Sequence, residues 1–230
     1  MCGRFTNSKP PNVFAELFHA KQGSLTLAPR YNIAPSTDVL ACRQIPEHGR
    51  ELVLLHWGLV PSWAKDPKAG YRMINARAET VAEKPAYRAA FKRRRCLIAA
   101  DGFYEWRPGA PRKQPYYIRL KGGEPFAFAG LWEHWELEGK KIESCTIIVT
   151  DANKLMAPIH DRMPVILAPQ DYDRWLDPQL QDAAALLPLL RPYPAGGMEA
   201  YPVSTLVNSP KNDRPELIAP EPTGESGQQL

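Results

Sequence analysis

The second residue of the chain, Cys2, directly follows the initiator methionine in the opening stretch MCGRF. A small residue at this position permits removal of Met1, which would leave Cys2 with a free α-amine beside its thiol. An α-amine has a pKa of about 7.7–8.0, so much of it is neutral and nucleophilic at physiological pH. Such an amine condenses with an aldehyde to an imine, and the nearby thiol then closes a five-membered thiazolidine ring. The alternative, favoured by position alone, is that Cys2 is an inert buried side chain.

Three further polar residues have types suited to imine chemistry. Glu105 ends a strand-like, aromatic stretch, DGFYEW, where a carboxyl can have a raised pKa and move protons; otherwise it is a salt-bridge partner. His160 lies in the turn-like IHDRMP and is a candidate acid or base, or else a structural histidine. Asn75, in MINARAET, can hold an amine or carbonyl oxygen, or else form a turn.

The elements that position these residues are mostly strands. Strand-forming stretches cover residues 51–60, 95–106, 114–120, 124–137 and 143–150, and EGKK at residues 138–141 resembles a hairpin turn. Amphipathic or helix-compatible stretches cover residues 11–20, 80–94, 171–177 and 180–190, with Pro85 interrupting the second. Strands and helices do not alternate regularly. We therefore predict one α+β domain, with a central twisted, mostly antiparallel β-sheet or open barrel flanked by short helices.

Composition limits the protein class. The 230 residues are 44% hydrophobic and 23% charged, with no apolar run near the ~20 residues of a membrane span and no secretory pattern, so we expect a cytoplasmic protein. The four cysteines are far apart, which predicts free thiols with no metal site, and no cofactor motif is present. A net charge of +4 permits a nucleic-acid partner without requiring one.

Seven motifs occur in one order along nearly the whole chain: MCGRF, YNIAPST, HWGLVPSW, INARAET, DGFYEW, IHDRMP and VNSPKNDRPELI. Together they resemble the SOS-response-associated peptidase (SRAP) family of abasic-site processing proteins. The resemblance predicts a domain over residues 1–221, followed by a flexible tail at residues 222–230. It also implies a protein that binds abasic single-stranded DNA and is associated with the nucleoid when bound. A monomer is the default expectation.

The resemblance implies a role for each motif residue. Cys2 would form a stable thiazolidine cross-link with the ring-opened sugar, shielding the lesion. Asn75 would position the amine and the sugar, Glu105 would transfer protons, and His160 would assist imine formation and ring opening. The same resemblance predicts removal of Met1 by the protein itself and a strand-cleaving lyase side reaction.

Five residues near these motifs are predicted to contact DNA. Arg4, Arg77 and Arg162 each lie within a few residues of a candidate catalytic residue, and guanidinium groups bind phosphate. Trp63 and Pro35 could stack on bases, although ordinary packing is the alternative. The KRRR run at residues 92–95 is interpreted as a solvated helix face that steers phosphates. Trp57, Trp132 and Trp135 are predicted to pack in the core or on a sheet face.

Two other functions are compatible with these residues. One is an N-terminal-nucleophile amidohydrolase, in which the Cys2 thiol attacks an amide and its own amine is the base. The other is a non-catalytic single-strand binder in which Cys2 is incidental. A lasting adduct with an aldehyde would distinguish capture from both.

Overall fold

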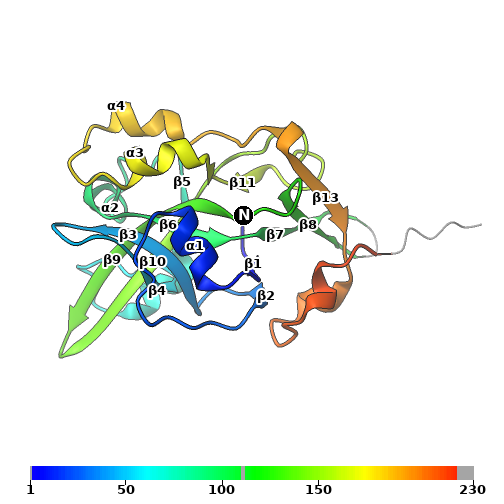
Figure 1. The fold of residues 1–230 in the computed structure, drawn as a ribbon, viewed down its shortest axis with the longest axis horizontal. Coiled ribbons are helices and arrows are strands. Elements are labelled where there is room, and N and C mark those ends of the chain that lie inside the picture. The colour runs from blue at the N-terminus through cyan, green and yellow to red at the C-terminus, as the bar shows by residue number, and fades with distance from the viewer. Residues whose placement is uncertain (1, 110–111, 222–230) are drawn as a thin grey trace, which may run out of the picture.

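Two mostly antiparallel β-sheets form the body of the computed structural model, which describes residues 2–109 and 112–221 (Figure 1). The smaller sheet contains, in spatial order, β13 (Met198–Pro202), β8 (Gln114–Leu120), β7 (Gly102–Arg107), β1 (Phe5–Asn7) and β2 (Arg30–Ile33). The larger sheet contains β3 (Asp38–Ile45), β4 (Gly49–Trp57), β5 (Asn75–Arg77), β6 (Arg95–Ala100), β9 (Phe126–Leu137), β10 (Lys140–Asp151), β11 (Arg162–Pro164) and β12 (Ile166–Leu167).

Five strands of the larger sheet close into a ring. The pairings run from β3 to β4, β10, β9, β6 and back to β3, and only the β4–β10 pair among them is parallel. Strand β5 adds to β10 in parallel, and β11 and β12 pair with β10 and β9. The predicted α+β class and mostly antiparallel pairing are confirmed, and the second sheet is an addition to the single sheet expected. The predicted tail at residues 222–230 lies outside the described residues.

The EGKK turn is confirmed as the tip of the long β9–β10 hairpin. Leu137 pairs with Lys140, so two residues connect the strands. Both connecting residues have positive φ, 51° for Glu138 and 77° for Gly139, as a type I′ turn requires. Figure 1 shows this hairpin extending away from the body of the molecule.

The stretch at residues 95–106 is two strands rather than the one predicted, because the chain passes from one sheet to the other at Asp101. Its carboxylate accepts hydrogen bonds from the Thr6 hydroxyl (2.5 Å) and the Ser8 amide (2.8 Å). The next residue must be glycine, since a Cβ on Gly102 would lie 2.1 Å from the Tyr117 hydroxyl oxygen. This crossing places DGFYEW on β7, in the same sheet as the N-terminal strand.

The helices are short and lie beside the strands (Figure 1). The α-helices are α1 (Pro11–Leu17), α2 (Arg88–Arg93), α3 (Tyr172–Leu176) and α4 (Ala183–Leu186). The 3₁₀ helices are η1 (Pro67–Arg72), η2 (Pro169–Asp171), η3 (Leu187–Leu189), η4 (Ala195–Gly197), η5 (Thr205–Asn208) and η6 (Pro215–Ile218). The helix predicted at residues 80–94 forms only as α2, after a series of turns that includes Pro85. No helix within residues 2–109 and 112–221 is long and apolar enough to cross a membrane.

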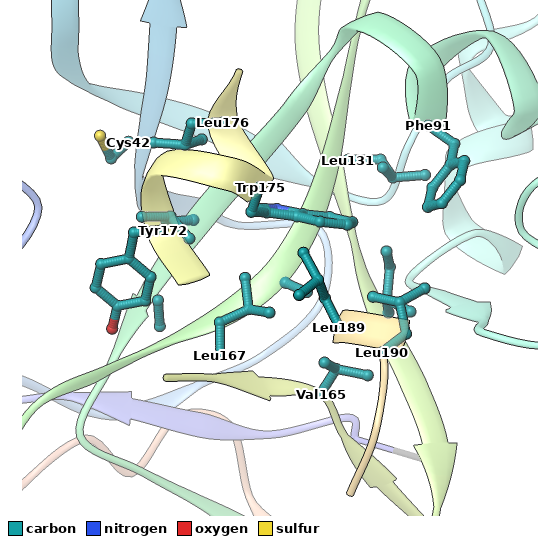
Figure 2. Close-up of a cluster of buried hydrophobic side chains, with 14 of the residues drawn as sticks. Cys42, Phe91, Leu131, Val165, Leu167, Tyr172, Trp175, Leu176, Leu189 and Leu190 are labelled. Carbon is teal, nitrogen blue, oxygen red and sulfur yellow. The ribbon is translucent and has the colours of Figure 1, made fainter. Parts of the chain in front are cut away.

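One hydrophobic cluster joins these helices to the barrel. Figure 2 shows the Trp175 ring of α3 lying among aliphatic side chains of β9 and η3, with Phe91 of α2 nearby. Phe91 and Trp175 make an edge contact with ring centroids 6.0 Å apart. Trp57 and Trp135 are 0% and 2% exposed, which confirms that they are core residues.

Arg95 departs from the interpretation of KRRR as a solvated face, because it is only 3% exposed. Its guanidinium donates to five backbone carbonyls, those of Trp175 (2.5 Å), Phe91 (2.6 Å), Lys92 (2.7 Å), Asp177 and Leu180 (2.9 Å). These carbonyls belong to the ends of α2 and α3 and the loop after α3, where helices leave carbonyls without partners. Arg95 therefore fastens both helices to β6.

Replacing Arg95 with methionine is expected to lower the free energy of unfolding by about 3 kcal/mol or more, since buried carbonyls would lose a charged donor. The melting temperature should fall by roughly 6–12 °C. Thermal denaturation checks this. Arg93→Met, at an exposed neighbouring position, is the control and should change the unfolding free energy by about 0.5 kcal/mol or less. Equal melting temperatures for both variants would contradict the fastening role.

Candidate functional site

The pairing of β1 with β7 brings the residues that precede Phe5 alongside Glu105. Phe5 pairs with Phe103, and the amide of Tyr104 donates to the carbonyl of Arg4 at 2.9 Å. Continuing this antiparallel register places residue 3 opposite Glu105. Cys2 itself is fully buried against the apolar interior of the barrel.

Asn75 reaches the same point from the other sheet. It begins β5, which pairs in parallel with β10 through Asn75 and Ile147. Its Nδ2 donates to the carbonyls of Cys2 (3.1 Å) and Ile74 (2.8 Å). Its Oδ1 is buried and has no hydrogen-bond partner in the described part of the chain. The amide nitrogen thus holds the backbone of Cys2, and the amide oxygen is a buried acceptor without a partner among the described residues.

Glu105 is a buried carboxyl, 3% exposed. Burial raises its pKa from 4.5 to about 7 by disfavouring the charged form, and the Asp161 carboxylate adds to this rise. The raised pKa inferred from the aromatic sequence around Glu105 is confirmed. A carboxyl with this pKa exchanges protons readily at neutral pH.

The Cys2 thiol is held in its protonated form. Burial raises its pKa above the ordinary value, and the nearby Glu105 carboxylate raises it further. A thiol in this setting becomes nucleophilic only as its proton leaves. Glu105 is electrostatically coupled to it and is therefore suited to receive that proton.

His160 lies in the loop between β10 and β11. Its Nδ1 accepts the amide of Arg162 at 3.0 Å, which leaves Nε2 to carry the proton of the neutral ring. Burial lowers the pKa of His160, so the neutral form dominates at neutral pH. The Asp161 carboxylate lies 2.8 Å from the same Nδ1, a contact that becomes favourable when the imidazole is protonated.

The three predicted DNA-binding arginines differ in their surroundings. Arg77 is exposed and lies two residues after Asn75, on the same face of β5. Arg162 is paired with Glu79 and lies 3.2 Å from Asp151. Arg4 is turned inward.

The Arg4 guanidinium makes internal contacts. Its Nη1 donates to Asn32 Oδ1 at 2.7 Å and to the Val207 carbonyl at 2.8 Å. Asn32 Nδ2 also donates to three carbonyls of residues 207–212. Arg4 and Asn32 therefore hold the VNSPKND segment against the smaller sheet, a structural role that the sequence did not indicate.

The two predicted stacking residues also differ. Trp63 is 67% exposed, whereas Pro35 is half-buried in the loop between β2 and β3. Sequence reasoning missed Tyr71, which is 62% exposed in η1. In the sequence, only its position in the turn-rich stretch after Trp63 could have indicated that this side chain is exposed.

The other thiols are not placed for chemistry. Cys42, Cys96 and Cys145 are buried and unpaired, and burial raises the pKa of each. No group of three or more potential metal ligands occurs among residues 2–109 and 112–221.

Comparison with known proteins adds to this geometry. A family model described as SOS response associated peptidase (SRAP) matches residues 1–210. The abasic site processing protein YoqW of Bacillus subtilis is 50% identical over 222 residues, covering 95% of this chain and 99% of that protein. The abasic site processing protein YedK of Escherichia coli is 31% identical over 226 residues, covering 96% and 100%.

The fold matches a crystal structure of a protein from Bacteroides thetaiotaomicron with a TM-score of 0.86 and 28% identity. The match covers 96% of this chain and 100% of that chain. The sheets that bring Cys2, Asn75 and Glu105 together are therefore part of a shared architecture.

Proposed function

This chain belongs to the SOS response associated peptidase family, and we propose that it captures abasic sites in single-stranded DNA through a covalent thiazolidine at Cys2. The family supports a role in processing abasic sites. The chemistry of capture is inferred from the residues around Cys2.

The contact between Asn75 and Cys2 carries the proposal. A side-chain amide that donates to the Cys2 carbonyl at 3.1 Å fixes the backbone of the second residue. Its Oδ1 remains a buried acceptor with no partner among the described residues. Once Met1 is removed, the α-amine of Cys2 is a suitable donor for it. An amine held by a neutral acceptor keeps its lone pair available for attack on an aldehyde.

Capture then proceeds in two steps. The amine nitrogen adds to C1 of the ring-opened sugar, and loss of water gives the imine. The Cys2 sulfur next adds to the imine carbon while its proton passes to the nitrogen, closing the ring. Glu105 accepts the thiol proton and returns it, and neutral His160 donates from Nε2 to the sugar oxygens during ring opening.

Two side reactions follow from the same residues. The imine also permits β-elimination of the 3′ phosphate, a lyase reaction that ring closure suppresses by consuming the imine. Removal of Met1 by the chain itself would begin with attack of the Cys2 thiol on the Met1 carbonyl, which moves the methionyl group from nitrogen to sulfur. Water then hydrolyses the thioester, releasing methionine and leaving the thiol and the free α-amine. Both are parts of the proposal that activity assays must establish.

The test is a cross-linking assay read by intact mass. Purified protein is mixed with single-stranded DNA carrying one abasic site, and the products are separated on a denaturing gel beside Cys2→Ala. The proposal requires a heat-stable adduct with the mass of the Met1-free protein plus DNA less one water, mapping to Cys2. No adduct from protein shown to lack Met1 would refute it.

Arg77→Ala is expected to weaken binding to intact and abasic single strands alike, since phosphate contacts are independent of the base. The negative slope of log affinity against log salt concentration should become shallower by about 0.7 for one lost contact. Fluorescence anisotropy across a salt series measures this. Arg77→Lys keeps the charge and should keep the slope. An unaltered slope in Arg77→Ala would exclude a phosphate contact.

A further inference from the structure

Two large aromatic side chains are exposed in the segment that leads into β5. Trp63 is 67% exposed and Tyr71 is 62% exposed. Within residues 2–109 and 112–221, the other exposed large apolar side chains are leucines. Exposed rings of this size keep apolar surface in contact with water, which is unfavourable, so a pair of them at one place indicates a binding surface.

Both rings line one open hollow of about 530 Å³. Lys65, Lys68 and Arg72 line the same hollow and form no ion pair with any described residue. The only acid in its lining is Asp66, whose carboxylate accepts the Lys68 amide at 2.9 Å and caps η1. The hollow therefore combines two flat apolar faces with an excess of positive charge.

The backbone that forms the hollow is held in place near both ends. The Trp135 indole donates to the Ala64 carbonyl at 2.7 Å, directly after Trp63. In η1, a Cβ on Gly70 would lie 2.5 Å from the Gly58 carbonyl oxygen, so the two backbones are in close contact. Since the backbone is already ordered, binding at this surface orders only side chains.

The hollow is also near the capture site. Tyr71 lies four residues before Asn75, and four extended residues span at most about 14 Å. A strand whose abasic sugar is at Cys2 can therefore place a flanking base over Tyr71.

We propose that Tyr71 adds a second ring to the predicted stacking residue Trp63, so that the two form a platform for bases beside the abasic site, while Lys65, Lys68 and Arg72 bind the adjoining phosphates. This subsite rests on the proposed function, because it assigns a second contact to the same DNA. Single-stranded DNA fits better than an apolar protein partner, since alternating flat rings and cations match alternating bases and phosphates.

Tyr71→Ala and Tyr71→Phe form a matched pair that tests the platform. The Kd for an undamaged single strand is measured by fluorescence anisotropy at fixed salt. Loss of the ring in Tyr71→Ala should weaken binding at least about fivefold, the equivalent of one stacked base. Tyr71→Phe keeps the ring and should bind within about twofold of the unaltered protein. Leu187→Ala, at an exposed leucine of η3, controls for loss of any apolar side chain.

The outcomes separate the platform from the capture chemistry. Unchanged binding by Tyr71→Ala would overturn the platform, and equal weakening by both Tyr71 variants would assign the effect to the hydroxyl and overturn stacking. Weakening confined to Tyr71→Ala supports it. Undamaged DNA offers no aldehyde, so absence of an adduct in the separate abasic assay would refute capture without affecting this result.

Discussion

A variant whose N-terminus is extended by residues that cannot be removed before Cys2 is expected to form no heat-stable adduct with abasic single-stranded DNA. An internal Cys2 keeps its thiol but has an amide nitrogen in place of the amine. An amide nitrogen cannot form the imine, so the thiol has no electrophilic carbon to attack. The adduct band should fall to the level of Cys2→Ala on a denaturing gel.

The matched control is the same extended protein carrying a protease site that leaves Cys2 at the new N-terminus. Cleavage should restore the adduct, and intact mass should show the loss of one water on joining. Binding of undamaged DNA before and after cleavage establishes that the fold is retained. Full cross-linking by the uncleaved protein would contradict the aminothiol mechanism.

Glu105→Gln is expected to slow adduct formation by about 10²–10⁴-fold, the usual contribution of a positioned proton-transfer group. Because the pKa of Glu105 is raised to about 7, the single-turnover rate of the unaltered protein should increase as pH rises through 7, where the carboxylate forms. The variant should keep only the rise that comes from deprotonation of the Cys2 α-amine, at about pH 7.7–8.0. An unaltered rate and pH profile would exclude Glu105 as the base.

The same substitution should increase stability. The folded pKa of Glu105, about 7, is above its unfolded value of 4.5, so the folded state binds the extra proton. Its contribution is most favourable below pH 4.5 and is lost as pH rises through 7. Glu105→Gln avoids this loss. Its free energy of unfolding should therefore exceed that of the unaltered protein by about 3 kcal/mol at pH 8, and by less at pH 5.5. Urea denaturation at both pH values measures this, with the exposed Glu124→Gln as control.

The opposite effects on rate and stability have one cause. A carboxyl whose pKa lies near 7 must be held away from water, and desolvation costs free energy whenever the group is charged. Glutamine keeps the shape without the charge. A site with this property is typical of proteins that hold a reactive group at some expense of stability.

Much of the protein could be predicted from the order of residues alone. The hairpin at Glu138 and Gly139 follows from local turn chemistry, because both positions need positive φ and only a short connection is available. The buried tryptophans and the mostly antiparallel strands follow from strand periodicity and apolar content. The chemistry proposed for Cys2 was predicted from its position, because removal of Met1 would give this residue an α-amine beside its thiol.

Contacts between distant segments required the folded chain. Arg95 lies in a run of four basic residues, and nothing local distinguishes it from Arg93, which is exposed. It is buried because α3, almost 80 residues later, presents carbonyls without partners to it. Likewise, only the folded chain shows that the Arg4 guanidinium is half-buried and donates to Asn32 and to the Val207 carbonyl.

The sequence by itself determined which chemical groups are available: an aminothiol precursor, a carboxyl, an imidazole and an amide. Only the tertiary structure decided that the carbonyl of residue 2, just before the first strand of the smaller sheet, lies 3.1 Å from the side-chain amide of Asn75, on the larger sheet. It also decided that Glu105 is buried away from water, which raises its pKa to about 7. The physical reason is that side-chain identity fixes reactivity in water, whereas distance and desolvation arise from packing segments far apart in the chain.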